Sequence, residues 1–83
     1  MIVLLAQNVL ERIGEMSITL KAARINAEMT RPEVVEQLKR DYDIEISVNT
    51  LGNYENKVSQ PDINTGKALA SIYGRSVDDI NFQ

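Results

Sequence analysis

The chain of 83 residues has room for one small domain, and its 43% hydrophobic content suffices for a single core. It contains no cysteine and no histidine, which excludes disulfides, thiolate and imidazole metal sites, and the nucleophiles and bases that those side chains supply. Nine Lys and Arg residues against twelve Asp and Glu residues give a net charge of −3, so a nucleic-acid partner would need a local surface that overrides the acidic whole.

The longest apolar run, residues 2–6, is too short to span a bilayer, and the start of the chain lacks the basic leader and cleavage site of a secretory signal. We therefore expect a cytoplasmic protein with no membrane partner. Apolar residues at positions 2, 5, 6, 9, 10 and 13 predict a first helix that ends at Gly14. Either this segment covers the core or builds a dimer, or Met16 is the true start. We divide the chain into an N-terminal extension, 1–15, and a domain, 16–83.

The second predicted helix begins after Thr19, a capping residue, and ends near residues 28–29. Leu20, Ala23 and Ala27 share one face of it. The third begins at Thr30-Arg-Pro-Glu33, which combines a capping Thr, an acid three residues later and Pro in the first turn. Its apolar stripe is formed by Val34, Val35 and Leu38. We expect it to run to about Lys39, with the charged residues 39–43 leading out of it.

The alternation in residues 42–46 is too short for a sheet and predicts an extended loop. A short helix follows over 47–55, capped by Ser47. Pro61-Asp62 begins the next helix, which closes at Gly74 and whose inward residues are expected to be Ile63, Ala68, Leu69 and Ile72. Ser76-Val-Asp-Asp79 resembles a capping box and predicts a last helical turn that contains Ile80 and Phe82. The sequence thus predicts an all-α fold, a compact bundle of five or six short helices.

The ordered set of segments from Thr19 to Phe82 resembles the lambda-repressor-like helix-turn-helix family, the Cro/repressor and xenobiotic-response-element group. The segments that carry the resemblance are Leu20-Lys-Ala-Ala-Arg24, Met29-Thr-Arg-Pro-Glu-Val-Val35, Ile46-Ser-Val-Asn-Thr-Leu-Gly-Asn-Tyr-Glu55, Pro61 and residues 68–80. The resemblance implies that 16–83 is a helix-turn-helix domain. One departure is a lengthened turn between the two helix-turn-helix helices, where residues 39–45 insert about six residues by hand alignment.

In this family a cation on the first helix and a carboxylate at the end of the recognition helix form a largely buried ion pair, and the resemblance assigns these roles to Arg24 and Glu55. Arginine suits such a pair because its planar fork binds a carboxylate at two points and keeps its charge when desolvated. The alternative is that these two side chains are surface charges that never meet.

The predicted recognition helix carries no charge between Glu45 and Glu55. Helical geometry places positions 48, 49, 52 and 53 on one outward face and turns Leu51 and Tyr54 inward. Asn reads adenine through two hydrogen bonds and Val packs on a thymine methyl, so Val48, Asn49 and Asn53 are the candidate base contacts. Gly52 indicates the close approach of another surface, because glycine inside a helix costs about 1 kcal/mol relative to alanine. Without the family resemblance, a short polar helix face needs no function.

Phosphate contacts are expected from helix N-termini and flanking polar groups. Arg31 lies in a first helical turn, where the helix dipole disfavours a cation, and this indicates that it reaches a phosphate. The remaining candidates are Ser47, Thr50, Asn56 and Lys57. Each of these side chains could equally be an ordinary solvated group. No nucleophile–base set or phosphate loop is present, and the acidic residues 41, 43 and 45 lack the Gly and terminal Glu of a calcium loop.

These patterns predict a sequence-specific, repressor-type transcription regulator from a prophage or bacterium, which binds double-stranded DNA as a homodimer and uses no cofactor, metal or catalytic residue. The alternative is a protein-interaction module of the same fold, such as an antitoxin or an anti-repressor partner, with weak or no DNA binding. The acidic balance and the lengthened turn favour this alternative. An antitoxin that binds both DNA and a toxin is a third possibility, which the sequence does not separate from the first.

Overall fold

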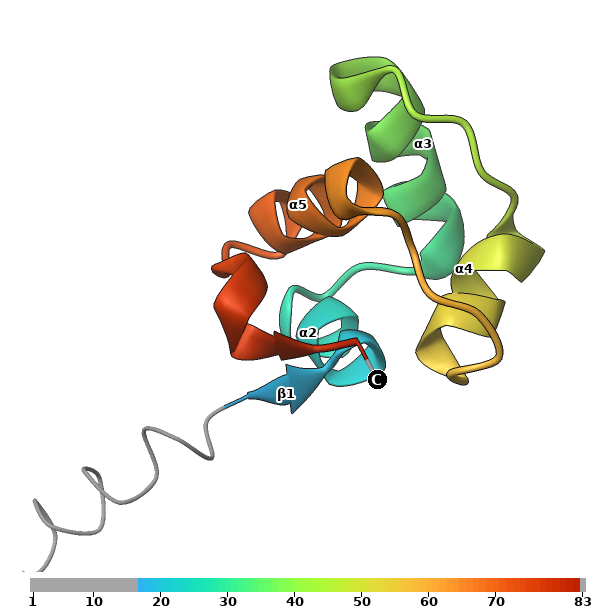
Figure 1. Cartoon of the computed structure of the whole chain (residues 1–83). Helices are drawn as coiled ribbons and strands as arrows, with labels where there is room; N and C mark the ends of the chain where they lie inside the picture. The colour runs from blue at the N-terminus through green and yellow to red at the C-terminus, as the bar shows by residue number, and fades with distance from the viewer. Residues whose placement is uncertain (1–16, 83) are drawn as a thin grey trace, which may run out of the picture.

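The computed structural model describes residues 17–82. The elements follow in the order β1 (Ile18–Thr19), α2 (Leu20–Asn26), α3 (Arg31–Tyr42), α4 (Val48–Glu55), α5 (Ile63–Ile72), the 3-10 helix η2 (Val77–Asp79) and β2 (Ile80–Asn81). The predicted mainly helical fold is confirmed, with four α-helices and one 3-10 helix in the described residues (Figure 1). The helix predicted over residues 2–13 lies outside them. No helix within 17–82 is long and apolar enough to cross a membrane.

The helices begin where the sequence places capping side chains. The Thr19 hydroxyl accepts a hydrogen bond from the Ala22 amide at the start of α2. Thr30 and Glu33 form the complete capping box predicted for α3. Side chains also cap the starts of the other helices, those of Ser47, Asp62 and Ser76. Each cap satisfies an amide that the first helical turn leaves without a partner, and this fixes the start of each element.

One apolar core lies between the helices. Val34 and Leu38 of α3, Leu51 of α4 and Leu69 of α5 are its largest fully buried side chains. The other members of the core, also buried, are Leu20, Ala23, Ala68, Ala70, Tyr73 and Ile80. Because α3 contacts both α4 and α5, the core holds the recognition helix predicted from the sequence against the rest of the domain. Figure 1 shows α4 beside α3 at the right edge of the molecule, with β1 at the left.

The third helix is longer than predicted. The sequence places residues 39–43 on the way out of it, whereas α3 continues to Tyr42 and ends at Asp43, which adopts the left-handed conformation with φ 56°. The Tyr42 hydroxyl donates to Ser71 Oγ at 2.9 Å and ties this extra turn to α5. Residues 39–45, which the resemblance implies are an insertion, are therefore divided between a longer α3 and a connection over 43–47.

The expectation that Ile63 points inward is wrong, because 76% of this residue is exposed. The buried face of α5 passes through Thr65, Gly66 and Leu69. A residue two positions before Thr65 is rotated by about 200° around the helix, which turns Ile63 toward solvent. The expectation that Ile80 lies in a last helical turn is also wrong, because η2 ends at Asp79 and Ile80 is extended.

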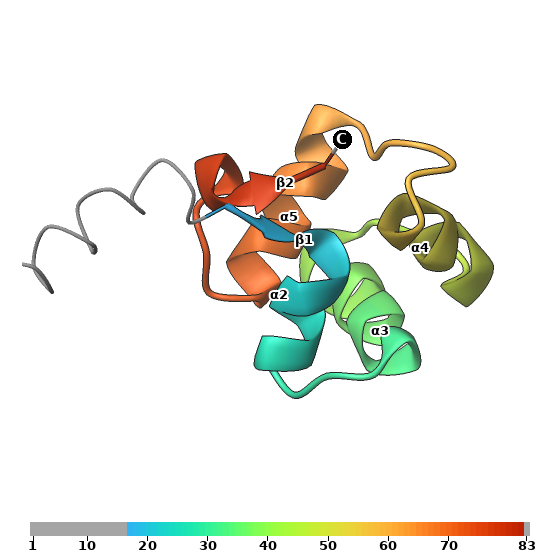
Figure 2. The same ribbon diagram turned by 90° about the horizontal axis from the view of Figure 1, so that it is seen from below.

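The extended residues after η2 close the domain. Ile80 and Asn81 pair in parallel with Ile18 and Thr19, in the register Ile18 to Ile80. Figure 2 shows the two strands side by side, where they connect the start of α2 to the end of the chain. This pairing places Ile80 in the core and Phe82 against α5.

Candidate nucleic-acid interface

The predicted recognition helix, α4, has the three candidate base contacts on its outer side. Val48 is 40% exposed, Asn49 is also exposed, and Asn53 is half-buried. Leu51 is fully buried and Tyr54 packs partly against the core, as the helical pattern predicts. The outer side of α4 is therefore uncharged and consists of one aliphatic and two amide side chains.

Gly52 does not belong to this outer side. The sequence groups it with positions 48, 49 and 53, but the structure buries it. A Cβ placed on Gly52 would lie 3.4 Å from Arg31 Nη1 and 3.5 Å from Arg31 Cζ. The surface that approaches this glycine is thus the guanidinium of α3, which lies across α4. The small size of residue 52 leaves room for this guanidinium beside α4.

A buried carboxylate joins three helices beneath this contact. The Glu55 side chain is fully buried, and Arg24 of α2 donates to it twice, from Nε to Oε2 at 2.7 Å and from Nη2 to Oε1 at 3.2 Å. Arg24 Nη1 also donates to the carbonyl of Met29 at 2.9 Å. The ion pair that the resemblance implies is present in the structure, with both carboxylate oxygens engaged.

Arg31 is a second cation on the same carboxylate. Its Nε donates to Glu55 Oε1 at 3.0 Å, and its side chain is 33% exposed. From the sequence, we expected this cation at the start of α3 to bind a phosphate of a ligand. The structure shows that Glu55, within the protein, is also a partner of Arg31. Two guanidinium groups and one carboxylate leave one excess positive charge at this place.

The electrostatics of the cluster follow from these contacts. The hydrogen bond to Glu55 raises the pKa of Arg24 above its ordinary value, although burial acts in the opposite direction. Burial raises the pKa of the Tyr73 hydroxyl, and the negative charge of Glu55 adds to this effect. The buried Tyr73 hydroxyl has no hydrogen-bond partner among the described residues. Arg24 therefore stays charged at any physiological pH, and Tyr73 stays neutral.

The other candidate phosphate contacts lie at the two ends of α4. Ser47 Oγ accepts from the Thr50 amide at 3.0 Å, and the two hydroxyls lie 2.9 Å apart at the start of the helix. Asn56 is the exposed C-cap residue, and exposed Lys57 follows it in the left-handed conformation with φ 62°. The structure therefore places polar groups at both ends of α4 and the candidate base contacts between them.

Acidic side chains adjoin this surface at the entry to α4. Asp41, Asp43 and Glu45 are exposed, and Asp41 pairs with Arg40 at 3.1 Å. No group of three or more His, Cys, Asp or Glu side chains in the described part of the chain is arranged to hold a metal ion. The exposed carboxylates therefore place negative charge along the chain just before α4.

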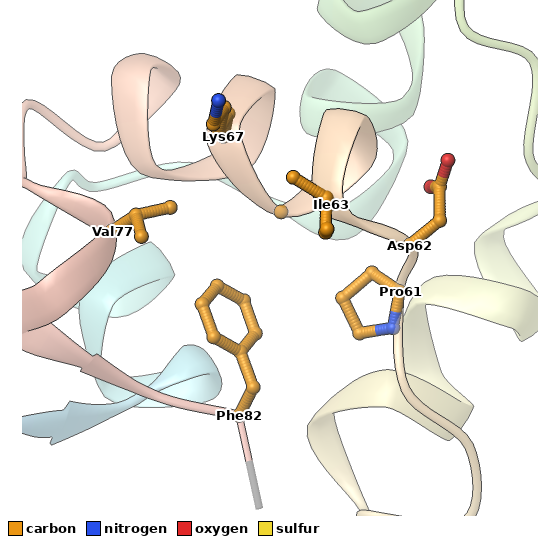
Figure 3. A pocket seen from close by; sticks show the side chains of 7 residues that line it. Pro61, Asp62, Ile63, Lys67, Val77 and Phe82 are labelled. Carbon is orange, nitrogen blue, oxygen red and sulfur yellow. The ribbon is translucent and has the colours of Figure 1, made fainter.

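A small apolar groove lies between α5 and the residues on either side of β2. It has a volume of about 190 Å³ and is lined by Pro61, Asp62, Ile63, Gly66, Lys67, Val77 and Phe82. Figure 3 shows the Phe82 ring between Val77 and Pro61, with Ile63 above it. The ring lies 3.6 Å from the position that a Cβ on Gly66 would occupy. Sequence reasoning missed this groove because it expected Ile63 in the core.

Comparisons with known proteins assign the arrangement to a family. Residues 20–80 match the sequence model of the family described as Helix-turn-helix, a stretch that extends from the start of α2 to Ile80 of β2. No curated protein and no solved structure gives a significant match. The matched stretch contains α3, the connection 43–47, α4 and the Arg24–Glu55 pair. The chain therefore belongs to the lambda-repressor-like, Cro/C1-type helix-turn-helix family, whose members are DNA-binding regulators.

Proposed function

We propose that the protein is a sequence-specific, repressor-type regulator that inserts α4 into the major groove of double-stranded DNA. The observation that carries this proposal is the uncharged outer side of α4, where Val48 and Asn49 are exposed and Asn53 is half-buried. An eight-residue helix is about 12 Å long, which is close to the width of the major groove. Asn49 and Asn53 would each bind adenine through two hydrogen bonds, and Val48 would pack on a thymine methyl.

The phosphate contacts in this proposal flank the groove. The amides at the start of α4, together with Ser47 and Thr50, contact one strand, because a helix N-terminus attracts anions. Asn56 and Lys57 contact the opposite strand from the other end of the helix. Both ends have the hydrogen-bond donors that phosphate oxygens require, and the exposure of Ser47, Asn56 and Lys57 supports these roles.

Dimerisation belongs to the same proposal, because one helix offers few base contacts. A two-fold dimer would place two copies of α4 on half-sites about 34 Å apart, with A·T pairs in each half-site. Sedimentation velocity of the wild type and of Ile63→Glu tests whether the apolar groove joins the copies. A dimer that the substitution dissociates supports this surface, and a dimer that the substitution leaves intact assigns the interface elsewhere.

A titration with mixed-sequence duplex DNA at increasing salt concentration tests DNA binding. For a sequence-specific DNA-binding protein, the logarithm of the association constant, log K, falls linearly with log salt by about 0.9 for each phosphate neutralised. Such a protein also discriminates between sequences at moderate salt. A protein that binds no DNA at low salt contradicts the proposal.

The second candidate is a protein-interaction module with weak or no affinity for DNA. The exposed carboxylates of Asp41, Asp43 and Glu45 favour it, since they lie before α4 and repel phosphates. The net charge of −3 acts in the same direction. Absence of DNA binding in the titration, combined with a normally folded protein, favours this candidate.

A further inference from the structure

We infer that Arg31 binds a DNA phosphate through its terminal nitrogens, and that Glu55 and Gly52 are the positioning residues that hold its guanidinium in place for this contact. The inference rests on the proposed function and adds to it the way in which the cation is held. It starts from a feature that a solvated surface arginine lacks. The guanidinium is fixed on two sides before any ligand arrives, by the Glu55 carboxylate and by α4 at Gly52.

Arg31 uses one of its three nitrogens for a hydrogen bond within the protein and leaves the other two available to a ligand. Nε donates to Glu55 Oε1 at 3.0 Å. Nη1 and Nη2 have no hydrogen-bond partner among residues 17–82, and one third of the side chain is exposed. The guanidinium uses only its Nε–H group for a hydrogen bond inside the protein. Its two terminal NH2 groups remain available as a fork of donors, and their planar arrangement matches the oxygens of a phosphate.

The charge of the cluster makes this fork attractive to anions. Arg24 alone balances the buried Glu55 carboxylate, with contacts to both of its oxygens. Arg31 therefore contributes a positive charge that the cluster does not cancel, in a chain whose net charge is −3. The start of α3 is already capped by Thr30 and Glu33, so the attraction for an anion at this place comes from the guanidinium of Arg31 and not from the helix end.

Gly52 supplies the second constraint. The distance of 3.4 Å between Arg31 Nη1 and the position of a Cβ on Gly52 is an ordinary van der Waals contact. Alanine therefore fits at this position and leaves the guanidinium in place. The γ-carbons of valine extend beyond Cβ into the space that Arg31 occupies, so valine displaces it. Gly52→Ala and Gly52→Val both keep the charge of Arg31, but only Gly52→Val moves its guanidinium. Comparing them tests the position of the cation at constant charge.

The test is a salt titration with mixed-sequence duplex DNA, applied to the wild type, Arg31→Met, Gly52→Val and the control Gly52→Ala. Arg31→Met removes the charge and the donors of the guanidinium, whereas Gly52→Val keeps the arginine and displaces it. We expect Arg31→Met and Gly52→Val to lower the slope of log K against log salt by about 0.9 and to weaken binding roughly eightfold at 0.1 M salt. Gly52→Ala should retain the slope of the wild type.

Circular dichroism spectra establish that each variant is folded before the titration, and a loss of stability in a folded variant does not change the salt slope. If the wild type binds DNA and both Arg31→Met and Gly52→Val keep its slope, the role of Arg31 is overturned while the proposed function stands. If Gly52→Ala lowers the slope as much as Gly52→Val does, Gly52 contacts DNA directly and the positioning role is wrong. If the wild type binds no DNA, the proposed function and this inference fail together.

Discussion

Arg24 of α2 and Glu55 of α4 form a buried two-point ion pair, with 2.7 Å between Nε and Oε2 and 3.2 Å between Nη2 and Oε1. The pair connects the first helix of the matched domain to the last turn of α4. Because Arg31 adds a third bond to the same carboxylate, Glu55 links α2, α3 and α4.

Glu55→Gln should therefore destabilise the fold by about 3–5 kcal/mol, since it leaves two guanidinium groups without their buried counter-charge. Urea unfolding followed by circular dichroism measures this change. Asp41→Asn is the matched control, because its pair with Arg40 is exposed and its loss should have no measurable effect. A Glu55→Gln variant as stable as the control would show that the pair contributes nothing to the assembly of the helices.

Tyr73→Phe should stabilise the protein by roughly 1 kcal/mol. The Tyr73 hydroxyl is buried without a hydrogen-bond partner among the described residues, so its removal eliminates a desolvation cost. Tyr42→Phe is the control, because it removes the 2.9 Å bond to Ser71 and should lower stability slightly. Thermal unfolding of the two variants measures both changes. A lower melting temperature for Tyr73→Phe would contradict the assignment.

Acid should destabilise the protein through two helix starts. The backbone hydrogen bond from Thr30 lowers the pKa of Glu33 from its ordinary 4.5, and the side-chain hydrogen bond with Thr65 lowers the pKa of Asp62 from 3.8. A carboxyl whose folded pKa is lowered contributes stability above its unfolded pKa and loses it as the pH falls through the folded value. Stability should thus decrease below pH 4.5.

Urea midpoints between pH 6 and pH 2.5 measure this loss for the wild type and for the double variant Glu33→Gln and Asp62→Asn. The double variant should show a flatter decrease on the acid side, because its two caps no longer titrate. An acid decrease as steep as that of the wild type would assign the effect to other carboxylates.

Lys57→Gly should separate backbone strain from charge at the end of α4. Lys57 has φ 62°, a conformation that costs most L-residues about 1 kcal/mol and glycine almost nothing. The variant should therefore unfold at a higher temperature or at an unchanged one. It should also weaken binding to all DNA sequences alike and lower the salt slope by about 0.9 if Lys57 contacts a phosphate. An unchanged slope would remove Lys57 from the interface.

Asn49→Ala should act on sequence preference instead. Loss of two hydrogen bonds to one adenine costs roughly 1–3 kcal/mol for the preferred sequence and relaxes the base choice at one position. Binding to a panel of sites with single base changes measures both effects, with Lys57→Gly as the comparison. If Asn49→Ala weakens every sequence by the same factor, Asn49 is not a base reader.

Local signals in the sequence predicted most of the fold. Thr19, Thr30 and Ser47 cap the helices where the pattern places them, because a cap depends only on the residues of the next turn. The β1–β2 pair was not predictable in this way, since Ile18 and Ile80 lie far apart along the chain. The length of α3 was also missed, because the bond between Tyr42 and Ser71 that ties its last turn to α5 is a tertiary contact.

The candidate site was also predicted only in part, because some of its features follow from local patterns and others depend on tertiary contacts. The exposure of Val48 and Asn49 follows from helical periodicity, and the partnership of Arg24 with Glu55 follows from the resemblance to the family. The contact between Arg31 and Gly52 depends on the crossing of α3 and α4, which no local pattern encodes. The sequence indicated a close approach at Gly52 and did not indicate the approaching group.

Selection of bound sites from random duplex DNA by the wild-type protein tests the central claim most directly, because it reports affinity, symmetry and spacing together. If α4 reads the major groove as a dimer, the selected sequences should contain two inverted half-sites with A·T pairs, one helical turn or about 34 Å apart. A selection that enriches no common sequence, with a protein that also binds no DNA at low salt, would contradict the account.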